Sequence, residues 1–371
     1  MKKYIFENKI LTAPVTVSII LGAVSAAIWR LCLTYVQAAD FFTGTVSFAL
    51  RFILTQATYL LPFSLAETML FACVPLVIFL LVKLFRAQKK RTALLKLFSR
   101  ALAVCGVFMF VFTFTLGVCY GKSPVNEKMG FERRLLGVGD LYSAMEILIG
   151  ELDTIAENIT YTAPESTKMP YGFKELNKKL NEAYKDMLAE YKLFTRINAR
   201  AKPAALISEI MSGMHITGVY SFFTGEANVN IIFPDYSLVY AAAHEMAHLM
   251  GVGREDEANF VAFLVCIRSG DDYIRYSGLA NMAEYIGSAL YRADAEKYFE
   301  VTANMPAVVK NESAAFARFF DKYRNTRISQ VASAVNNNYL KAQGQEQGVK
   351  SYGFVVDLAV AYLLEVHNCE K

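Results

Sequence analysis

The chain has 371 residues, 54% of them hydrophobic, and a mean hydropathy of +0.29. These values exclude an ordinary soluble protein and indicate membrane-spanning segments. The formal net charge of +4 is unevenly divided, because residues 1–122 carry 13 basic and 3 acidic side chains whereas residues 123–371 carry 25 and 31. The basic excess accompanies the apolar segments, which argues against a nucleic-acid partner.

Three apolar segments are predicted to cross a bilayer as helices. Residues 10–29 and 101–120 each contain 20 residues without a charge, which matches the ~20 residues that a helix needs to cross about 30 Å of hydrocarbon. Residues 52–82 are almost entirely apolar and are divided by Pro62. We predict the second span at residues 65–82 and, before it, a helix lying in the membrane interface. The alternative for all these segments is the buried helical core of a soluble protein.

The distribution of lysine and arginine predicts the orientation of these spans. Residues 83–100 are predicted to be a loop, and they contain seven basic residues and no acidic one. Lys2, Lys3 and Lys9 precede the first span. Because basic residues mark the cytoplasmic side, both regions are predicted to be cytoplasmic. Three crossings then place residues 123–371 outside the cytoplasm.

Residues 123–371 are predicted to form one domain, mainly α-helical with a small β-hairpin or sheet, attached to a membrane domain at residues 1–122. Five segments have apolar residues at helical spacing; these are 141–159, 173–194, 282–302, 313–325 and 351–366. Residues 215–223 and 226–233 read as two short strands around the turn sequence Thr224-Gly225.

The six cysteines do not form an evident disulfide framework. No CxxC motif is present in the sequence, so a zinc site made of cysteines is not expected. A disulfide between Cys266 and Cys369 stays open as an alternative.

One stretch of the outer region, AAAHEMAHLMGVGREDEANF at residues 241–260, contains two of the four histidines. His244, Glu245 and His248 fit the pattern HExxH. On a helix, residues four apart are separated by about 40° and 6 Å, so both imidazoles face one way and can hold one Zn²⁺ at about 2.0–2.1 Å. Glu245 is then predicted to be the general base for a water at the metal. The alternative is two surface histidines on an ordinary helix.

A catalytic zinc site needs a third protein ligand. The peptidase pattern that ends in a third histidine is excluded, because Arg254 stands at that position. The acidic sequence EDEAN follows, and we expect Glu255 to be the ligand, with Glu257 as the alternative. An unbroken helix would place Glu255 about 10.5 Å along the axis from His248. A break is therefore required, and the sequence GVG at residues 251–253 supplies it.

One further polar side chain is predicted to lie near this centre. Asn259 follows Glu255 by four residues, so on a helix both would lie on one face. We expect Asn259 to accept a hydrogen bond from a ligand histidine, which would fix the orientation of that ring.

These motifs resemble those of known proteins. HExxH followed by ExxAN is similar to the glutamate-zincin peptidases, and the chain as a whole resembles an uncharacterised bacterial membrane family, domain of unknown function 3810. The similarity is carried by the segments LPFSL, TGVYSFFTGEANVN, HEMAHLMGVGREDEANFVAFLVC, RYSG and YLKAQGQEQGVKSYGFVVDL. The resemblance implies a multi-pass protein of the bacterial cytoplasmic membrane with a zincin-like outer domain. It also implies His244, His248 and Glu255 as zinc ligands and Glu245 as the base.

In such peptidases, an edge strand near the zinc pairs with an extended substrate. The resemblance therefore suggests residues 226–230 as the substrate strand, with contacts from Glu226, Asn228 and Asn230, and a further contact from Tyr276. The alternative is a plain hairpin that only supports the helix. Four residues are candidates for stabilising an oxyanion; these are His215, Tyr220, Tyr276 and Tyr352.

The expected function is that of a membrane-anchored zinc peptidase with a peptide or protein substrate and the lipid bilayer as partners. The first alternative is a membrane sensor or scaffold that binds zinc without turnover. The second is a transporter or assembly protein in which HExxH occurs by chance. Zinc content separates this last class from the other two, and hydrolysis separates the peptidase from the sensor.

Overall fold

The first third of the chain contains four helical stretches that are long and apolar enough to cross a membrane. The computed structural model describes residues 9–133, 135–159, 161–163, 166–324, 327–345, 347 and 354–367. Among these residues, the four stretches are Ala13–Thr34, Val36–Tyr59, Leu65–Phe85 and Lys90–Thr115. The count differs from the three predicted spans, because the segment before Pro62 forms a stretch of full membrane length.

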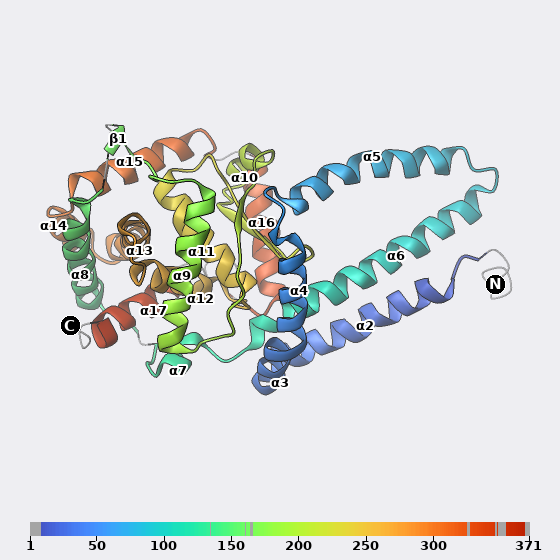
Figure 1. The fold of residues 1–371 in the computed structure, drawn as a ribbon, viewed down its shortest axis with the longest axis horizontal. Helices are drawn as coiled ribbons and strands as arrows, with labels where there is room; N and C mark the ends of the chain where they lie inside the picture. Colours follow the sequence, from blue (N-terminus) through green and yellow to red (C-terminus); the bar gives the residue numbers. More distant parts are fainter. Residues whose placement is uncertain are drawn as a thin grey trace.

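The labels of these helices follow Figure 1. The first stretch is α2 (Ala13–Thr34), and the second consists of α3 (Val36–Phe42), a π-helical turn (Thr43–Ser47) and α4 (Phe48–Tyr59). The third and fourth stretches are α5 (Leu65–Phe85) and α6 (Lys90–Thr115). Helix α5 begins at the residue predicted for the second span.

Three of these helices project away from the rest of the molecule, whereas α4 does not. In Figure 1, α2, α5 and α6 extend to one side and α4 runs across them at the border of the remaining chain. The side chains of α4 contact the rest of the protein, because Thr55 Oγ1 donates to Gly225 O (3.1 Å) and Thr58 Oγ1 donates to Thr224 O (3.3 Å). The one buried residue of α5, by contrast, is Glu67.

Helix α6 begins earlier than the charge pattern predicts. It starts at Lys90, inside the predicted loop at residues 83–100, so the loop prediction is wrong for residues 90–100. Leucine, alanine, lysine and arginine favour helices, so the helix needs no break where the charges begin. Helix α6 ends at Thr115 and is followed by a 3₁₀ helix, η2 (Gly117–Gly121).

Helices α2 and α6 cross at glycines. A Cβ atom at Gly22 would lie 2.5 Å from Gly106 Cα, and a Cβ atom at Gly106 would lie 2.1 Å from Ser18 O. The two backbones are therefore closer than they could be if either glycine had a side chain. Small residues permit this close approach between helices in membranes.

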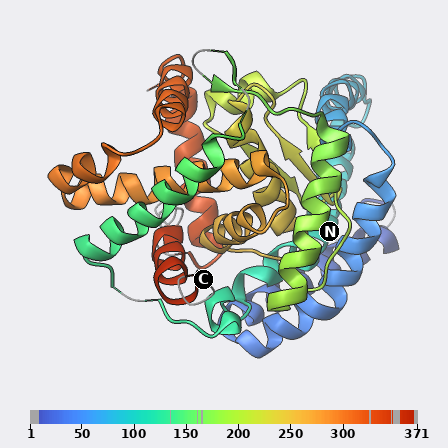
Figure 2. The same cartoon turned by 60° about the vertical axis from the view of Figure 1, so that its left-hand side comes forward.

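The remaining chain is mostly helical, and the blue membrane helices lie to one side of it in Figure 2. Its helices are α7 (Val125–Met129), α8 (Val138–Ala156), α9 (Phe173–Tyr191), α10 (Ser208–Gly213), α11 (Asp235–Leu249), α12 (Glu255–Ile267), α13 (Asp272–Ala293), α14 (Ala295–Thr302), α15 (Ala307–Asp321), α16 (Arg327–Ala342), α17 (Val355–Ala361) and a π-helical segment, Tyr362–His367. These helices confirm a mainly α fold.

The predicted helix at residues 282–302 is divided in two. Helix α13 ends at Ala293, and α14 starts after Asp294, whose side chain accepts a hydrogen bond from Lys297 N (3.0 Å). This N-cap ends one helix and starts the next.

Residues 351–353 and Cys369 lie outside the described residues, so a disulfide with Cys266 stays an open alternative.

Two sheets are present in the described chain. Strands β1 (Tyr161–Ala163) and β2 (Ser166–Thr167) form a small pair. The other sheet has the order β3-β5-β4, made of β3 (Ala201–Pro203), β4 (Gly218–Ser221) and β5 (Glu226–Val229). The predicted hairpin is confirmed as the antiparallel pair β4–β5, whereas β3 adds a parallel strand that was not predicted.

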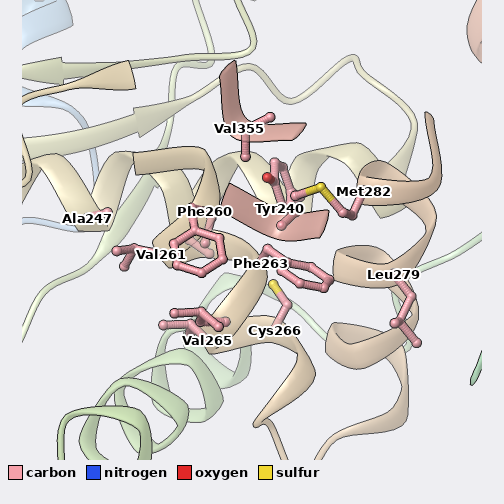
Figure 3. Packing of buried hydrophobic residues seen from close by; sticks show 14 of the residues in the cluster. Tyr240, Ala247, Phe260, Val261, Phe263, Val265, Cys266, Leu279, Met282 and Val355 are labelled. Atoms are coloured by element: carbon pink, nitrogen blue, oxygen red, sulfur yellow. The ribbon is translucent and has the colours of Figure 1, made fainter. Parts of the chain in front are cut away.

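The core surrounds α11 and α12. Residues Tyr236–Leu249 of α11 and Glu255–Cys266 of α12 are all buried, as expected of helices enclosed by others. Figure 3 shows Phe260 and Phe263 of α12 close to Tyr240 of α11 and Met282 of α13. The HExxH helix and the helix after it therefore form a rigid centre rather than a surface.

Gly106→Ala should destabilise the packing of α2 against α6. The new Cβ would meet the backbone of Ser18, which cannot rotate away, so we expect a loss of about 1–3 kcal/mol in the free energy of unfolding. The matched control is Gly150→Ala in α8, where no described heavy atom lies within 4 Å of the new Cβ. There the change should be neutral or stabilising by up to about 1 kcal/mol. Thermal unfolding in detergent measures both, and an unchanged Tm for Gly106→Ala would contradict the tight crossing.

Candidate metal centre

The turn between α11 and α12 returns the chain towards the two histidines. Helix α11 closes with a Schellman-type pair of hydrogen bonds, in which Val252 N donates to Ala247 O (3.1 Å) and Gly251 N donates to His248 O (2.9 Å). Gly251 has a φ of +94°, a left-handed conformation that glycine adopts at little cost. Helix α12 then begins at Glu255. The predicted glycine break is therefore confirmed.

His244, His248 and Glu255 come together as one buried cluster. The distance between the two Nε2 atoms is 3.1 Å, and Glu255 Oε2 lies 3.3 Å from His244 Nε2 and 3.4 Å from His248 Nε2. Ligands at about 2.0–2.1 Å from a tetrahedral zinc ion are separated by about 3.3 Å. The three donor atoms therefore have the separation that a single small cation requires.

Hydrogen bonds orient one of the two imidazoles. His248 Nδ1 lies 2.8 Å from Val252 O, so Nδ1 donates its proton to this carbonyl, and the neutral ring that binds a metal would have its Nε2 lone pair towards the cluster. His244 Nδ1 is buried without a hydrogen-bond partner among the described residues, and so is Asn259 Nδ2. The predicted hydrogen bond from a ligand histidine to Asn259 is thus not formed in this side-chain arrangement.

The charges of the cluster stabilise one another. Burial lowers the pKa of His248, but the carboxylate of Glu255 raises it further, so that the pKa reaches about 9. Burial raises the pKa of Glu255, but His248 and His244 together hold it well below its usual range. The carboxylate of Glu255 is therefore ionised across the physiological pH range, as a metal ligand must be.

Glu245 lies against strand β4. A Cβ atom at Gly218 would be 2.5 Å from Glu245 Cγ and 2.6 Å from its Oε1. Burial raises the pKa of Glu245, His244 and His248 lower it, and the carboxyl accepts a hydrogen bond from the backbone of Tyr220. The side chain predicted to be the base is therefore held between the histidines and β4 by contacts that leave no room for a larger residue at position 218.

Glu257, the alternative ligand, is engaged elsewhere. Its Oε1 accepts from Val125 N (2.7 Å) and from the guanidinium of Arg254. Asp256, between the two glutamates, pairs with Arg133 (2.5 Å). Successive residues of a helix point about 100° apart, so only Glu255 of this acidic run reaches the histidines.

The prediction that residues 226–230 form a substrate-binding edge strand is wrong. Residues 226–229 are β5, the central strand, which pairs with β3 on one side and β4 on the other. The sequence concealed this because β3 is only three residues long, includes Pro203 and pairs across a gap of more than twenty residues. The edge strand beside Glu245 is β4, with the side chain of Val219 42% exposed.

The four polar residues expected to bind substrate have structural contacts. Glu226 Oε1 pairs with Lys202 Nζ at 2.5 Å. Asn228 Nδ2 donates to Val219 O, and Asn230 Nδ2 donates to the backbone near its own strand. Tyr276 donates to Glu312 from inside α13. All four are buried, and their contacts with substrate stay predictions.

Of the four residues expected to stabilise an oxyanion, His215 and Tyr276 have partners elsewhere, and the role of Tyr220 stays a prediction. His215 Nε2 lies 3.2 Å from Tyr323 O, and the His215 ring packs on Phe320. Tyr220 OH is buried without a hydrogen-bond partner among the described residues, and Tyr276 is bound to Glu312. Tyr352 lies outside the described residues.

Tyr339 of α16 is a neighbour of the centre that sequence reasoning missed. Its hydroxyl lies 3.2 Å from the hydroxyl of Tyr120. Burial raises the pKa of Tyr339, the Tyr120 hydrogen bond lowers it, and the nearby charge of Glu255 raises it again. Tyr339 lies in the polar sequence NNNYLK, more than eighty residues after Glu255, and no local signal links the two.

Arg51 of α4 is the second residue that sequence reasoning missed. It is buried, and its Nη1 donates to Leu249 O (3.0 Å) at the carboxyl end of α11. Its other nitrogens donate to Thr43 O and Ser47 Oγ, both at 3.1 Å. A cation at this end of a helix is favoured by the helix dipole. A lone arginine inside the apolar stretch at residues 36–59 was the available signal.

Comparison with known proteins places this architecture in one family. The family model described as "Protein of unknown function (DUF3810)" matches residues 43–360. No curated protein and no solved structure matches the chain. The match extends from the π-helical turn before α4 into α17, so it includes Arg51, α5 and the cluster of His244, His248 and Glu255.

Gly251→Ala should destabilise the protein more than Gly130→Ala does. Both glycines have positive φ, +94° and +81°, which costs a non-glycine residue about 1–2 kcal/mol. A Cβ at Gly251 would also lie 2.6 Å from Arg51 Nη1, whereas no described heavy atom is within 4 Å at Gly130. The buried Arg51 cannot move freely, which adds about 1–3 kcal/mol. Thermal unfolding monitored by circular dichroism measures the difference; equal losses in the two variants would show that the Arg51 contact is not tight.

Proposed function

The chain belongs to the DUF3810 family of proteins of unknown function, and we propose that it is a membrane-anchored, zinc-dependent peptidase. The observation that supports this best is the cluster of His244, His248 and Glu255, whose donor atoms are 3.1–3.4 Å apart. Two imidazoles and one carboxylate are the donor set of catalytic zinc sites, which leave a fourth position open. Structural zinc sites instead have four protein ligands.

The chemistry follows from the residues around the cluster. A bound zinc ion would polarise a carbonyl and lower the pKa of water towards about 7. Glu245 would accept a proton from the attacking water and deliver it to the leaving amine. The contact with Gly218 and the hydrogen bond from the backbone of Tyr220 hold its carboxylate on the side of the cluster that faces β4.

Strand β4 is the proposed substrate-binding strand. Its antiparallel partner is β5, with Gly218 opposite Val229, and Asn230 N donates to Thr217 O (2.9 Å). In an antiparallel ladder, the backbone groups of alternate residues point away from the partner strand. An extended peptide that added to β4 would therefore pair with the backbone of Gly218 and with the carbonyl of Tyr220 and pass Glu245.

A zinc-binding sensor without turnover is the second candidate, and the burial of the centre favours it. The exposed fractions of His244, Glu245, His248 and Glu255 are 8%, 4%, 6% and 7%. A sensor, however, does not need a carboxylate beside the ligands, and Glu245 is held there by a glycine contact. Hydrolysis therefore separates the two candidates.

We propose that three helices cross the membrane and that α4 lies at its surface. Helix α4 makes hydrogen bonds with residues 198, 224 and 225 along one side, which a helix surrounded by lipid could not make. With α2, α5 and α6 as spans, the basic residues 83–100 are cytoplasmic. The metal centre then faces the outside of a bacterial cytoplasmic membrane.

Zinc content tests the ligand set. The purified wild-type chain should contain one zinc per molecule by elemental analysis, and His244→Ala and Glu255→Gln should lose most of it. His215→Asn is the matched control, because asparagine tolerates the left-handed backbone of His215, and it should keep the metal. Equal zinc in the wild type and His244→Ala would exclude the site.

Glu245→Gln should keep zinc but lose about 10²–10⁴-fold in hydrolysis of a peptide library followed by mass spectrometry. Glutamine has the same shape but cannot take a proton. Cleavage by this variant at the wild-type rate would exclude Glu245 as the base.

Gly218→Ala tests the position of the base without replacing Glu245 itself. The new Cβ would displace the Glu245 carboxyl, and a shift of about 1 Å in a reacting group costs on the order of 100-fold in rate. Zinc content should be unchanged. Gly213→Ala, where no described heavy atom lies within 4 Å, is the control and should keep its rate. Full activity in Gly218→Ala would show that the contact with β4 does not position Glu245.

A further inference from the structure

We infer that the metal centre lies at the bilayer surface and that its substrate is a peptide segment adjoining a membrane anchor. The statement about the substrate rests on the proposed peptidase function. The statement about position does not, because it follows from contacts between the membrane helices and the cluster.

The ends of the membrane helices converge on the metal centre. Helix α6 continues into η2, which touches the turn before Glu255, since a Cβ at Gly253 would lie 2.7 Å from Tyr120 N. Helix α4 reaches the end of the HExxH helix through Arg51 and Leu249 O (3.0 Å). Each contact is to a residue within four positions of a predicted ligand.

The amino end of α5 is bound directly to the sheet. Leu65 N and Ala66 N donate to the Glu226 carboxylate of β5 at 3.0 and 2.9 Å. In return, Glu67 Oε1 accepts from Leu206 N (2.6 Å) and from the following amide (2.8 Å) in front of α10. The first turn of this apolar helix and the sheet therefore form one rigid unit.

The height of the centre above the bilayer follows from the sheet register. Glu226 is opposite Ser221, and Gly218, which touches Glu245, lies three residues further along β4. At about 3.3 Å per residue, the separation along the strand is about 10 Å. The headgroup layer extends about 5–8 Å beyond the hydrocarbon on each side. Because about 10 Å is the largest height that this part of the strand can add, whatever its tilt, Glu245 lies within the headgroup layer or just above it.

An exposed apolar face of α16 continues this surface. Ile328, Val331 and Val335 are 61%, 63% and 63% exposed, although they share one face of the helix. The sequence of α16 contains Arg327 and Lys341 and no acidic residue, whereas the outer region as a whole is acidic. In Figure 1, α16 and α4 both run across the direction of the projecting helices, as helices that lie in the plane of a membrane do.

Contacts at both ends tie α16 to the membrane helices. Before its start, Lys322 Nζ donates to Glu209 of α10 (2.8 Å), and the backbone in front of α10 is bound by Glu67 of α5. Just beyond its end, a Cβ at Gly344 would lie 3.8 Å from Leu33 of α2. The carboxyl end of α16 therefore lies next to α2, the segment before its amino end is joined to α10, and we assign the bilayer as the partner that covers the apolar face.

Two exposed apolar residues at the start of α10, one just before the helix and one within it, widen this face. Leu206 and Ile210 are 67% and 57% exposed beside the first turn of α5. We call Leu206, Ile210, Ile328, Val331 and Val335 the bilayer-facing surface. A patch of this kind that is continuous with membrane helices marks a membrane contact.

Tyr339 connects the bilayer-facing surface to the metal centre. It follows Val335 by four residues, so it lies on the same face of α16. Its hydroxyl lies 3.2 Å from that of Tyr120, and the backbone of Tyr120 packs on Gly253 in the turn before Glu255. A peptide that leaves the bilayer beside α16 is therefore already close to the metal centre. An extended chain covers about 3.3–3.6 Å per residue, so peptide bonds from about the third residue after an anchor reach Glu245.

Fluorescence quenching tests the position. The chain has one tryptophan, Trp29, so Trp29→Phe gives a background into which Val219→Trp, Val331→Trp or Phe299→Trp is introduced. All three positions are exposed, and α14, the helix that contains Phe299, lies on the side opposite to α5 and α6 in Figure 1. In vesicles of phosphatidylethanolamine and phosphatidylglycerol, a headgroup nitroxide lipid should quench the first two strongly and leave Phe299→Trp unquenched.

Equal quenching at all three positions, or none at Val219→Trp and Val331→Trp, would overturn the inference. A third outcome is that Val219→Trp is quenched, Val331→Trp is not, and two chains can be chemically crosslinked. This outcome would assign the apolar face to a second copy and overturn the lipid assignment. Because the readout needs no catalysis, its failure is independent of the peptidase proposal.

A second experiment tests the substrate. A peptide library is joined to a single transmembrane helix and reconstituted with the full chain, and the same library is supplied in soluble form. Tethered cleavage should exceed soluble cleavage by at least ~10-fold because of the raised effective concentration, with cut sites close to the anchor. Equal cleavage of both would overturn the inference but keep the peptidase. If neither the tethered nor the soluble library is cleaved while the quenching is as expected, the peptidase function is overturned and the substrate assignment with it.

Discussion

The turn at residues 250–252 is the constraint on which the metal centre depends. Gly251 accepts the left-handed conformation that ends α11, and the carbonyl of Val252 in the same turn binds the Nδ1 of His248. One short segment thus stops a helix, reverses the chain so that Glu255 faces the histidines, and fixes the ring of a ligand. A side chain at position 251 would disturb all three, because Arg51 fills the space beside it.

The centre is also inseparable from the membrane part of the molecule. Arg51 binds the carbonyl of Leu249, η2 packs on Gly253, and Glu226 caps the first turn of α5. These contacts come from three different segments of the first third of the chain, and each reaches the sheet or the turn that holds the cluster. The remaining chain is therefore built onto the membrane helices rather than joined by a linker, which is why we propose a substrate that the bilayer presents.

Local patterns predicted the elements and the ligands, because both depend on residues close in sequence. Helical spacing placed His244 and His248 on one face, the glycines predicted the break, and Glu255 was the first acid after it; the structure brings all three together. Non-local pairing was not predictable. The short strand β3 makes β5 a central strand, so Glu226 and Asn228 lie inside the sheet. Tyr339 comes near the centre through its contact with Tyr120, from a helix that carries no local signal. The charge pattern likewise concealed that residues 90–100 are helical.

X-ray absorption at the zinc edge of the purified chain tests the central claim most directly, because it measures the ligands of a bound ion without reference to any substrate. The account predicts two imidazole nitrogens and oxygen ligands at about 2.0–2.2 Å, with no sulfur in the coordination sphere. A sulfur ligand at about 2.3 Å, or a zinc spectrum unchanged by His248→Ala, would contradict it.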